Sequence, residues 1–223
     1  MPDDNFEKEC LLICEGVGDK RFFQKLFLSR GIGGDIEVKS VNENIDGQSG
    51  GRGNMGNYLK AVQENENFIE NVKIIIIVSD NDEDVNASFL EVQKQLRIAD
   101  LPVPENVQEL VHRRNKKSVA VLMVPPGQIG NLESMCLPAA ISKWGLQEEL
   151  DEWVAATPAS TWPLGKQAKV KIQALISAHH KRLPETGFAA HWRSDEQLCT
   201  PLNHATFNDV VSFLERVPEM LGR

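Results

Sequence analysis

The sequence predicts an α/β fold, in which a doubly wound, mostly parallel sheet of four to five strands is flanked by helices and followed by a helical C-terminal extension. Two observations lead to this prediction. Residues 73–79 contain four consecutive isoleucines and a valine, an apolar run rich in β-branched side chains that suits a parallel strand buried on both faces. Residues 132–221 carry Leu, Met, Trp, Ile and Phe at spacings of three to four, which is typical of helices.

The N-terminal elements follow in order. Residues 9–15 are an apolar run and predict the first strand. The turn at residues 16–18 contains two glycines, and Asp19 is well placed to cap the next helix. Residues 20–30 repeat Phe and Leu at helical spacing, and residues 36–41 alternate apolar and polar side chains as a second strand would.

Residues 42–56 are rich in glycine and asparagine and match no phosphate-binding loop motif. They predict either a mobile surface loop or an active-site flap whose Arg52 meets phosphate. A helix is expected over residues 57–69, and another near residues 87–99, after the isoleucine strand.

The densest basic run is residues 112–117, HRRNKK, between a short strand or helix at residues 107–111 and a buried strand at residues 118–124. It is either a solvated turn or a surface that holds a phosphate backbone beside the acidic site. In the second case its substrate-binding residues are Arg113, Arg114, Lys116 and Lys117.

The C-terminal part predicts helices over residues 132–143, 146–156, 167–181 and 205–221, with a linker at residues 157–164. His179 and His180 are expected to be exposed, because adjacent residues do not share a helix face. The cysteines, Cys10, Cys14, Cys136 and Cys199, fit no zinc pattern and are expected to be small core residues.

Composition sets outer limits on function. The hydrophobic content of 41% and charged content of 25% are ordinary for a soluble globular protein. A net charge of −8 argues against a protein that coats polyanions, although basic residues can still cluster locally. The first ten residues lack a signal-peptide pattern and no run approaches the roughly 20 residues of a spanning helix, so we expect a cytoplasmic protein without a membrane partner.

Carboxylates follow three of the predicted strands. Glu15 follows the first strand, Asp80 and Asp82 follow the isoleucine strand, and Glu133 opens the helix after residues 118–124. Open α/β sheets bind ligands at this edge, and carboxylate oxygens suit Mg²⁺. Strand alternation would point Asp80 and Asp82 in the same direction. The alternatives are a solvated acidic turn and, for Glu133, a favourable interaction with the helix dipole.

Two of these groups resemble a known domain. The first motif is Glu15-Gly16 after an apolar strand, with Asp19 nearby (LLICEGVGDKRFF), and the second is an Asp-x-Asp that closes a later strand (IIIIVSDND). Together they resemble the toprim domain, which is found in topoisomerases, bacterial primases, recombination-associated proteins and overcoming-lysogenisation-defect nucleases. The rest of the chain is similar to small stand-alone toprim-like proteins related to those nucleases. The similarity lies in a strand followed by Pro and then Gly-Asn-Leu-Glu-Ser, in the helix with KQAKVK and in the Phe-rich last helix. The resemblance covers nearly the whole chain, with a toprim-like, Rossmann-like core at residues 8–145 and a helical extension at residues 146–223 packed on it.

The sequence also departs from that family. It has no extra lysine in the turn at residues 16–18, and its one tyrosine, Tyr58, lies in a predicted helix. Relaxation of DNA by tyrosine transesterification is therefore not expected, and neither is primer synthesis.

The resemblance implies phosphoryl transfer that depends on Mg²⁺ or Mn²⁺. Asp80 and Asp82 would hold the metal, Glu15 would be a further ligand or the general acid/base, and a second ion would bind Glu133 and Asp19. Clustered carboxylates repel one another, so at least one pKa should rise without metal.

We therefore expect a nuclease-like enzyme acting on DNA or RNA, with Glu15, Asp80, Asp82 and Glu133 as catalytic residues. The alternative is a non-catalytic module that binds metal, nucleic acid or a partner protein. The positions of residues 112–117 and 166–171 relative to the acidic site discriminate between the two.

Overall fold

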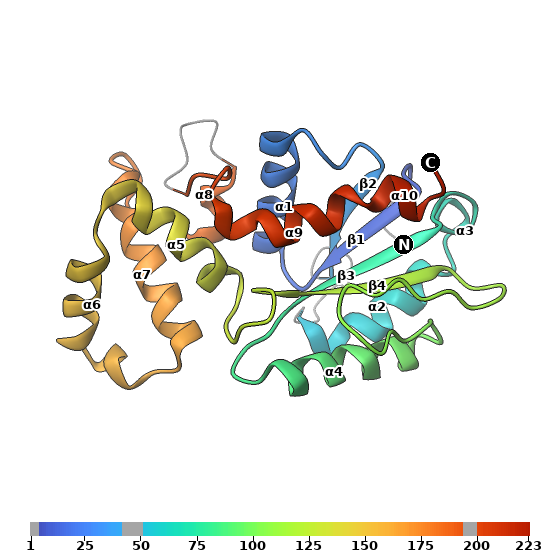
Figure 1. Ribbon diagram of the computed structural model, residues 1–223, viewed down its shortest axis with the longest axis horizontal. Coiled ribbons are helices and arrows are strands. Elements are labelled where there is room, and N and C mark those ends of the chain that lie inside the picture. Colours follow the sequence, from blue (N-terminus) through green and yellow to red (C-terminus); the bar gives the residue numbers. More distant parts are fainter. Residues whose placement is uncertain (1–4, 42–50, 194–199) are drawn as a thin grey trace.

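A sheet of four parallel strands, in the order β2-β1-β3-β4, forms the centre of the molecule (Figure 1). The computed structural model describes residues 5–41, 51–193 and 200–223. The strands are β1 (Cys10–Cys14), β2 (Ile36–Ser40), β3 (Ile74–Asp80) and β4 (Ser118–Val124). The predicted α/β class and parallel sheet are confirmed, with four strands in the described part of the chain.

Helices cover both faces of this sheet. The longer helices are α1 (Val17–Arg30), α2 (Met55–Val62), α3 (Glu66–Asn71), α4 (Val85–Ile98), α5 (Leu132–Trp144), α6 (Gln147–Ala155), α7 (Leu164–His179) and α9 (Asn208–Glu215). The short ones are η2 (Arg52–Asn54), η3 (Pro158–Thr161), α8 (Phe188–His191), η4 (Ala205–Phe207) and α10 (Val217–Met220). Figure 1 shows α1 and α9 on one side of the sheet, and α2 and α4 on the other.

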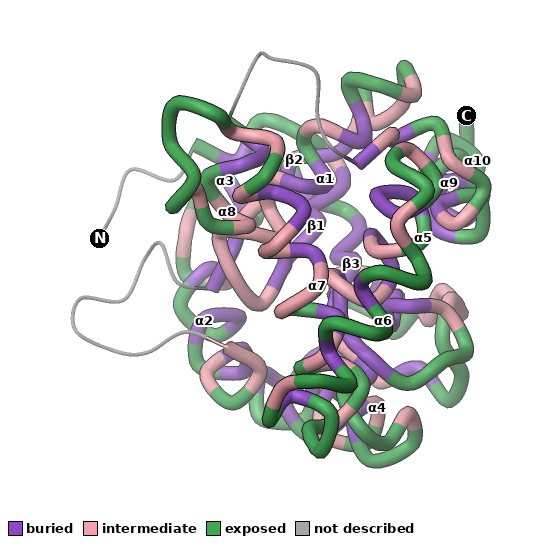
Figure 2. Tube along the Cα trace, turned by 90° about the vertical axis from the view of Figure 1, so that its left-hand side faces the viewer, coloured by how far each residue is buried: buried purple, intermediate pink, exposed green. Residues whose placement is uncertain are grey.

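The alternation of side chains along the strands builds two cores. Leu12 and Ile76 face the layer of α1, α5 and α9, whereas Leu11 and Ile75 face the layer of α2 and α4. All five residues of β1 are buried because both of their faces are covered. In β2, at the edge of the sheet, buried and half-buried residues alternate as predicted. Figure 2 shows the buried strands inside a largely exposed outer shell.

Two predicted helices are divided in the structure. The helix expected over residues 57–69 is interrupted after Val62, because Asn65 caps a new helix by accepting a hydrogen bond from the backbone N–H of Phe68 at 3.1 Å. The helix expected over residues 205–221 is η4, α9 and α10, and α10 has Pro218 in its first turn, where the missing N–H costs no helical bond.

Other boundaries also differ from the predictions. The helix expected over residues 167–181 begins at Leu164, and the linker before it contains η3. Residues 107–111 form no named element, although Val111 makes a single antiparallel bridge with Val119.

The C-terminal part completes the core of the sheet. Trp192, Phe207 and Val210 are buried in the same hydrophobic cluster as Phe22 of α1 and Leu12 of β1. Residues on both sides of the predicted division at residue 145 therefore share one core. The last residue, Arg223, bonds to Asp35 (2.6 Å) and to Glu9, which precede β2 and β1.

The predictions for cysteines and histidines have different outcomes. Cys10, Cys14 and Cys136 are buried, as predicted, whereas Cys199 lies outside the described residues. The predicted exposure of the paired histidines is wrong. His179 and His180 are half-buried, because the ring of His180 lies against buried His191, with Nε2 and Nδ1 2.9 Å apart. Among the described residues, no helix is long and apolar enough to cross a membrane.

Candidate functional site

The strand order creates a switch point between β1 and β3. The chain leaves β1 for β2 on one side and later enters β3 on the other, so the connections diverge at the carboxyl ends of these neighbours. Ligands of open α/β sheets bind at such a point. Glu15 directly follows β1, and Asp80 is the last residue of β3. The sequence prediction that these carboxylates share one edge is consistent with this topology.

Arg52 lies at the centre of this edge. Its Nε donates to Oε1 of Glu15 at 3.1 Å and to Oγ of Ser79 at 2.7 Å. Its Nη2 donates to Oδ2 of Asp82 at 3.0 Å and to the backbone carbonyl of Asp80. The side chain of Arg52 is 14% exposed. One guanidinium therefore joins the ends of β1 and β3.

Glu15 is held from the β3 side as well. The same oxygen, Oε1, accepts hydrogen bonds from the backbone N–H of Asp80 (3.2 Å) and from the hydroxyl of Ser79. Ser79 is 1% exposed at the end of the isoleucine run. Together with Arg52 these donors fix the carboxylate against the end of β3.

Asp80 has a half-buried side chain at the N-terminus of a helix. Its Oδ1 accepts a hydrogen bond from the backbone N–H of Leu132, the first residue of α5, at 3.0 Å. Burial raises the pKa of Asp80 well above its ordinary value, and the nearby carboxylates of Asp19, Glu15 and Glu133 raise it further. The predicted pKa increase is thus confirmed, with burial as its larger cause.

Two further carboxyl groups at this edge bind protons more tightly than in water. Asp19, in the first turn of α1, accepts a hydrogen bond from the backbone N–H of Gly16 at 3.0 Å, and burial raises its pKa to about 7. Burial also raises the pKa of Glu133 in α5, although Lys169, with Nζ 3.9 Å from Oε1 of Glu133, opposes the increase. A cation near these groups would relieve the cost of ionising them.

Asp82 does not continue the strand. Its φ of 49° is left-handed, a conformation that Asp tolerates better than most residues, and its side chain is 56% exposed. Backbone hydrogen bonds of 2.6 Å in both directions join it to Gly130. The prediction that Asp80 and Asp82 point the same way by strand alternation is therefore wrong, although both residues bond to Arg52.

Asn81, between the two aspartates, anchors this turn from inside. Its buried Nδ2 donates to the carbonyls of Pro125 (2.6 Å) and Gln128 (2.7 Å), in the loop after β4. The turn after β3 and the loop that leads into α5 are therefore held together at the edge of the sheet.

A groove of about 420 Å³ opens beside this turn. Arg52, Asp82 and Glu83 line one part of it, and Lys166 and Lys169 of α7 line another. The start of α7 is held next to that of α5, because Nδ2 of Asn131 donates to the carbonyl of Gly165 at 3.2 Å. The groove thus combines carboxylates with amines from the helical extension.

The comparisons with known proteins concern almost the whole chain. The family model DUF3226, described as a protein of unknown function, matches residues 9–219. The chain belongs to this family. No curated protein matches it. Two structures of the C-terminal region of the Xanthomonas campestris pv. campestris OLD protein, phased with mercury and with iodine, are similar to this DUF3226 protein. The mercury-phased structure has 13% sequence identity and a TM-score of 0.45, and the match covers 98% of this chain and 100% of that one. The iodine-phased structure has 14% identity and a TM-score of 0.43, and the match covers 97% of this chain and 98% of that one.

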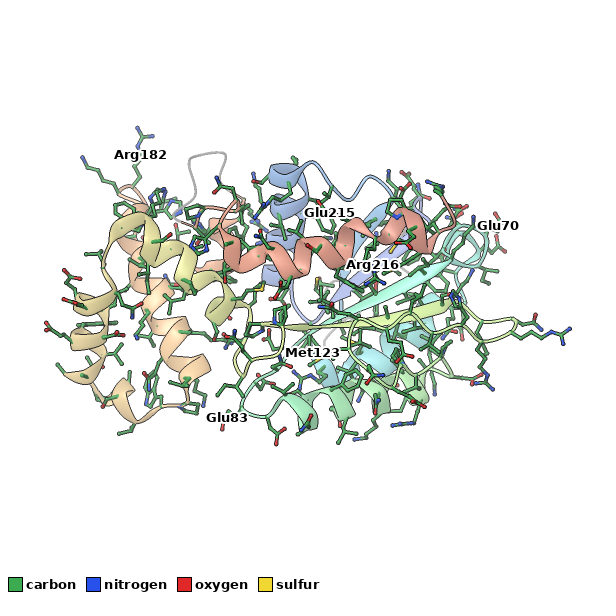
Figure 3. The ribbon with its side chains drawn as sticks, in the orientation of Figure 1. Glu70, Glu83, Met123, Arg182, Glu215 and Arg216 are labelled. Atoms are coloured by element: carbon green, nitrogen blue, oxygen red, sulfur yellow. The ribbon has the colours of Figure 1, made fainter. Side chains whose placement is uncertain are left out.

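The basic run of this DUF3226 protein lies far from the acidic edge. Residues 112–117 directly precede β4, so they lie at the amino edge of the sheet. Because β4 has seven residues, its carboxyl end is about 20 Å away. Arg113 and Lys116 pair with Asp100, and Lys117 bonds to the carbonyl of Ile69 in α3. Figure 3 shows Glu70 of α3 and Glu83 of the groove at opposite ends of the sheet. The structure therefore does not bring Arg113, Arg114, Lys116 and Lys117 to the site where they were predicted to bind substrate.

Some residues of the site were missed from the sequence. Ser79, Asn131 and Lys169 were not assigned to it, and the lysines at residues 166–171 were only a discriminating feature. A serine buried at the end of an apolar strand is a signal that could have identified Ser79. The partners of Asn131 and Lys169 depend on how α7 packs against α5, which no local pattern contains.

The donor set of this edge fits a hard cation. Within the described ranges, no three His, Cys, Asp or Glu side chains already converge as a metal site. The guanidinium of Arg52 lies between Glu15 and Asp82 and is the cation that these carboxylates contact. The oxygens gathered there, from carboxylates, a hydroxyl and a carbonyl, are of the type that Mg²⁺ and Ca²⁺ bind.

Proposed function

We propose that this DUF3226 protein is a phosphoryl-transfer enzyme dependent on Mg²⁺ or Mn²⁺, and most specifically a nuclease-like enzyme that hydrolyses phosphodiester bonds in DNA or RNA. The observation that carries the proposal is the set of carboxyl groups at the switch point, of which the half-buried Asp19, Asp80 and Glu133 have raised pKa values. The resemblance of the strand ends to the toprim domain supports the same chemistry.

Two groups of residues would hold the ions. Asp80, Asp82 and Glu15 would hold the first, and Asp19 with Glu133 would hold the second. A bound ion would polarise a phosphodiester and lower the pKa of water. The protein itself brings these carboxylates to one edge, through Asn81 and the helix start at Leu132.

The groove supplies contacts for the substrate. Lys166 and Lys169 line it together with Asp82, so a phosphate in the groove would meet these amines as well as the proposed ion. These lysines replace residues 112–117 as the proposed contacts to the phosphate backbone.

A non-catalytic module is the second candidate. It is favoured by the net charge of −8 and by the position of residues 112–117 at the far edge, so that Arg52, Lys166 and Lys169 are the basic residues that line the groove among those the structure describes. Such a module would bind metal, nucleic acid or a partner protein without turnover.

Isothermal titration with Mn²⁺ and Mg²⁺ tests the metal site. In the variant Asp80→Asn with Asp82→Asn, we expect Mn²⁺ affinity to fall at least tenfold, about 1.4 kcal/mol. The amide that replaces the carboxylate at position 80 keeps an oxygen that can accept the bond from Leu132. The matched control is Asp100→Asn, an exposed carboxylate at the amino edge that pairs with Lys116, and it should bind Mn²⁺ as the wild type does.

Cleavage of labelled single- and double-stranded DNA and RNA, with metal and with EDTA, tests the activity. Cleavage that needs the ion and is abolished in the double variant supports the nuclease. Metal binding without cleavage of any substrate favours the non-catalytic module. If neither the wild type nor any variant binds metal, Arg52→Ala included, the proposal of a metal site at this edge is contradicted.

A further inference from the structure

We propose that Arg52 is an exchangeable internal cation: in the metal-free protein its guanidinium fills the space between Glu15 and Asp82 that the first metal ion would use, and it moves to the substrate phosphate when the ion binds. The proposal rests on the proposed function, since it concerns the same metal site. One arginine would thus have two successive roles.

The guanidinium of Arg52 is surrounded by oxygen atoms from the ends of β1 and β3. Nε and Nη2 of Arg52 contact four oxygens: a carboxylate oxygen of Glu15, one of Asp82, the hydroxyl of Ser79 and the carbonyl of Asp80. These are hard donors from two strand ends that point at one positive group. They form the same kind of oxygen shell that a divalent ion requires.

The guanidinium and a bound ion compete for the same space. Mg²⁺ binds oxygen at about 2.1 Å, so an ion that uses Glu15 and Asp82 needs the space that Nε and Nη2 fill. The guanidinium and the ion therefore cannot occupy this position together. Each must weaken the binding of the other by the same factor.

The released side chain of Arg52 would remain next to the groove. Arg52 already lines the groove that contains Lys166 and Lys169. Once its bonds to the strand ends are broken, its planar donors face this groove, where they match a phosphate in a bidentate manner. The exchange would thus couple metal loading to the positive charge available for substrate.

The competition predicts tighter metal binding when Arg52 is removed. Arg52→Ala should bind Mn²⁺ about 5- to 150-fold more tightly than the wild type by titration calorimetry, the usual range for coupled sites. Arg52→Lys, which keeps the charge but lacks the fork, should lie between the two. The matched control is Arg30→Gln, because Arg30 also makes several hydrogen bonds, to the carbonyls of Leu202 and His204, but contacts no carboxylate of the site.

A salt series separates direct occupation from general repulsion. The gain in Mn²⁺ affinity of Arg52→Ala should persist between about 0.05 and 0.5 M salt, because repulsion through solvent is screened while occupation of the same space is not. A gain that disappears at high salt would overturn the exchange.

A second measurement needs no variant. In the wild type, we expect the ¹H–¹⁵N signal of Arg52 Nε to be protected from solvent exchange, because Nε donates to Glu15 and Ser79. Addition of saturating Mg²⁺ should shift this signal and remove its protection, and a phosphodiester analogue should shift it again. An Nε signal that keeps its protection in the Mg²⁺-loaded protein, or an Arg52→Ala variant that binds metal no more tightly than the wild type, overturns the exchange and leaves the metal site standing.

Discussion

Asp19 has a proton affinity that its position in a capping turn would not suggest. An aspartate in the first turn of a helix ordinarily ionises easily, because the helix dipole and the Gly16 N–H favour its charge. Burial next to Glu133 and Glu15 outweighs both effects and raises its pKa to about 7. The protonation of this residue thus changes close to neutral pH.

The stability of the metal-free protein should therefore depend on pH through Asp19. A group with a raised folded pKa favours the folded state below its unfolded pKa, and this stabilisation is lost as the pH rises through the folded pKa. We expect the free energy of unfolding to fall between about pH 4 and pH 7. Saturating Mn²⁺ should reduce this fall, because the ion stabilises the ionised form.

Urea denaturation across this pH range, with and without Mn²⁺, is the measurement. Asp19→Asn keeps an acceptor for the N–H of Gly16 and should make the metal-free fall smaller, with the remainder due to Asp80 and Glu133, whereas Asp209→Asn, at an exposed position of α9, should leave the fall unchanged. A wild-type profile that rises steadily over this interval would contradict the assignment.

At the scale of elements, the loop between β4 and α5 positions the site. Gly130 adopts a φ of 125°, bonds to Asp82 in both directions, and lies next to the cap of α5. A Cβ at this position would be 2.6 Å from Oγ of Ser134, in the capping box of Asn131. A positive φ that favours glycine, the cap of α5 and the Asp82 turn therefore meet at one residue.

Gly130→Ala should destabilise the protein by about 1–3 kcal/mol, the cost of forcing a non-glycine residue into such a conformation. It should also weaken Mn²⁺ binding, because the displaced loop carries Asp82 with it. Urea unfolding and calorimetry measure the two effects. Gly34→Ala, where an added Cβ meets nothing within 4 Å, should change stability by less than about 0.5 kcal/mol. Equal stability of both variants would show that the loop tolerates a side chain.

The sequence was most informative about strands and about the acidic edge. The β-branched apolar run within Ile74–Asp80 is typical of a central strand in a sheet covered on both faces, and parallel strands put their carboxyl ends at the same edge. The sequence was less informative about contacts that depend on topology. The direction of β4 places residues 112–117 at the amino edge of the sheet, far from the acidic site. The hydrogen bonds of Arg52 join it to Glu15, which is 37 residues away in the sequence, and to Ser79, which is 27 residues away. Neither result follows from local periodicity.

For the molecule as a whole, the distribution of positive charge decides where a nucleic acid could bind. Lys166 and Lys169 line the groove, whereas Arg113 and Lys117 lie beyond the other end of the sheet. The two pairs carry the same charge, so they can be compared directly.

Lys166→Gln with Lys169→Gln should weaken binding to nucleic acid and lower the slope of log affinity against log salt by roughly one for each phosphate that the removed amines no longer neutralise. Arg113→Gln with Lys117→Gln should leave the slope unchanged. Fluorescence anisotropy at several salt concentrations measures both. A larger effect of the second pair would move the binding surface to the amino edge.

The C-terminal helices should unfold together with the sheet. Phe207 is fully buried, and its ring centroid lies 5.5 Å from that of Phe22 in α1. Phe207→Ala should therefore cost about 3–5 kcal/mol in one cooperative transition. Leu28→Ala, at a side chain that is 72% exposed, is the control and should cost less than about 0.5 kcal/mol. Separate transitions in circular dichroism and tryptophan fluorescence would indicate two independent units.

The position of Arg223 has a practical consequence. Its ion pairs with Glu9 and Asp35 fasten the last residue beside the starts of β1 and β2 (Figure 1), at the end of the sheet opposite the groove. A tether or fluorophore attached there would project away from Lys166 and Asp82. Attachment to a surface at Arg223 would thus leave the groove open to solution, which suits surface-based measurements of binding.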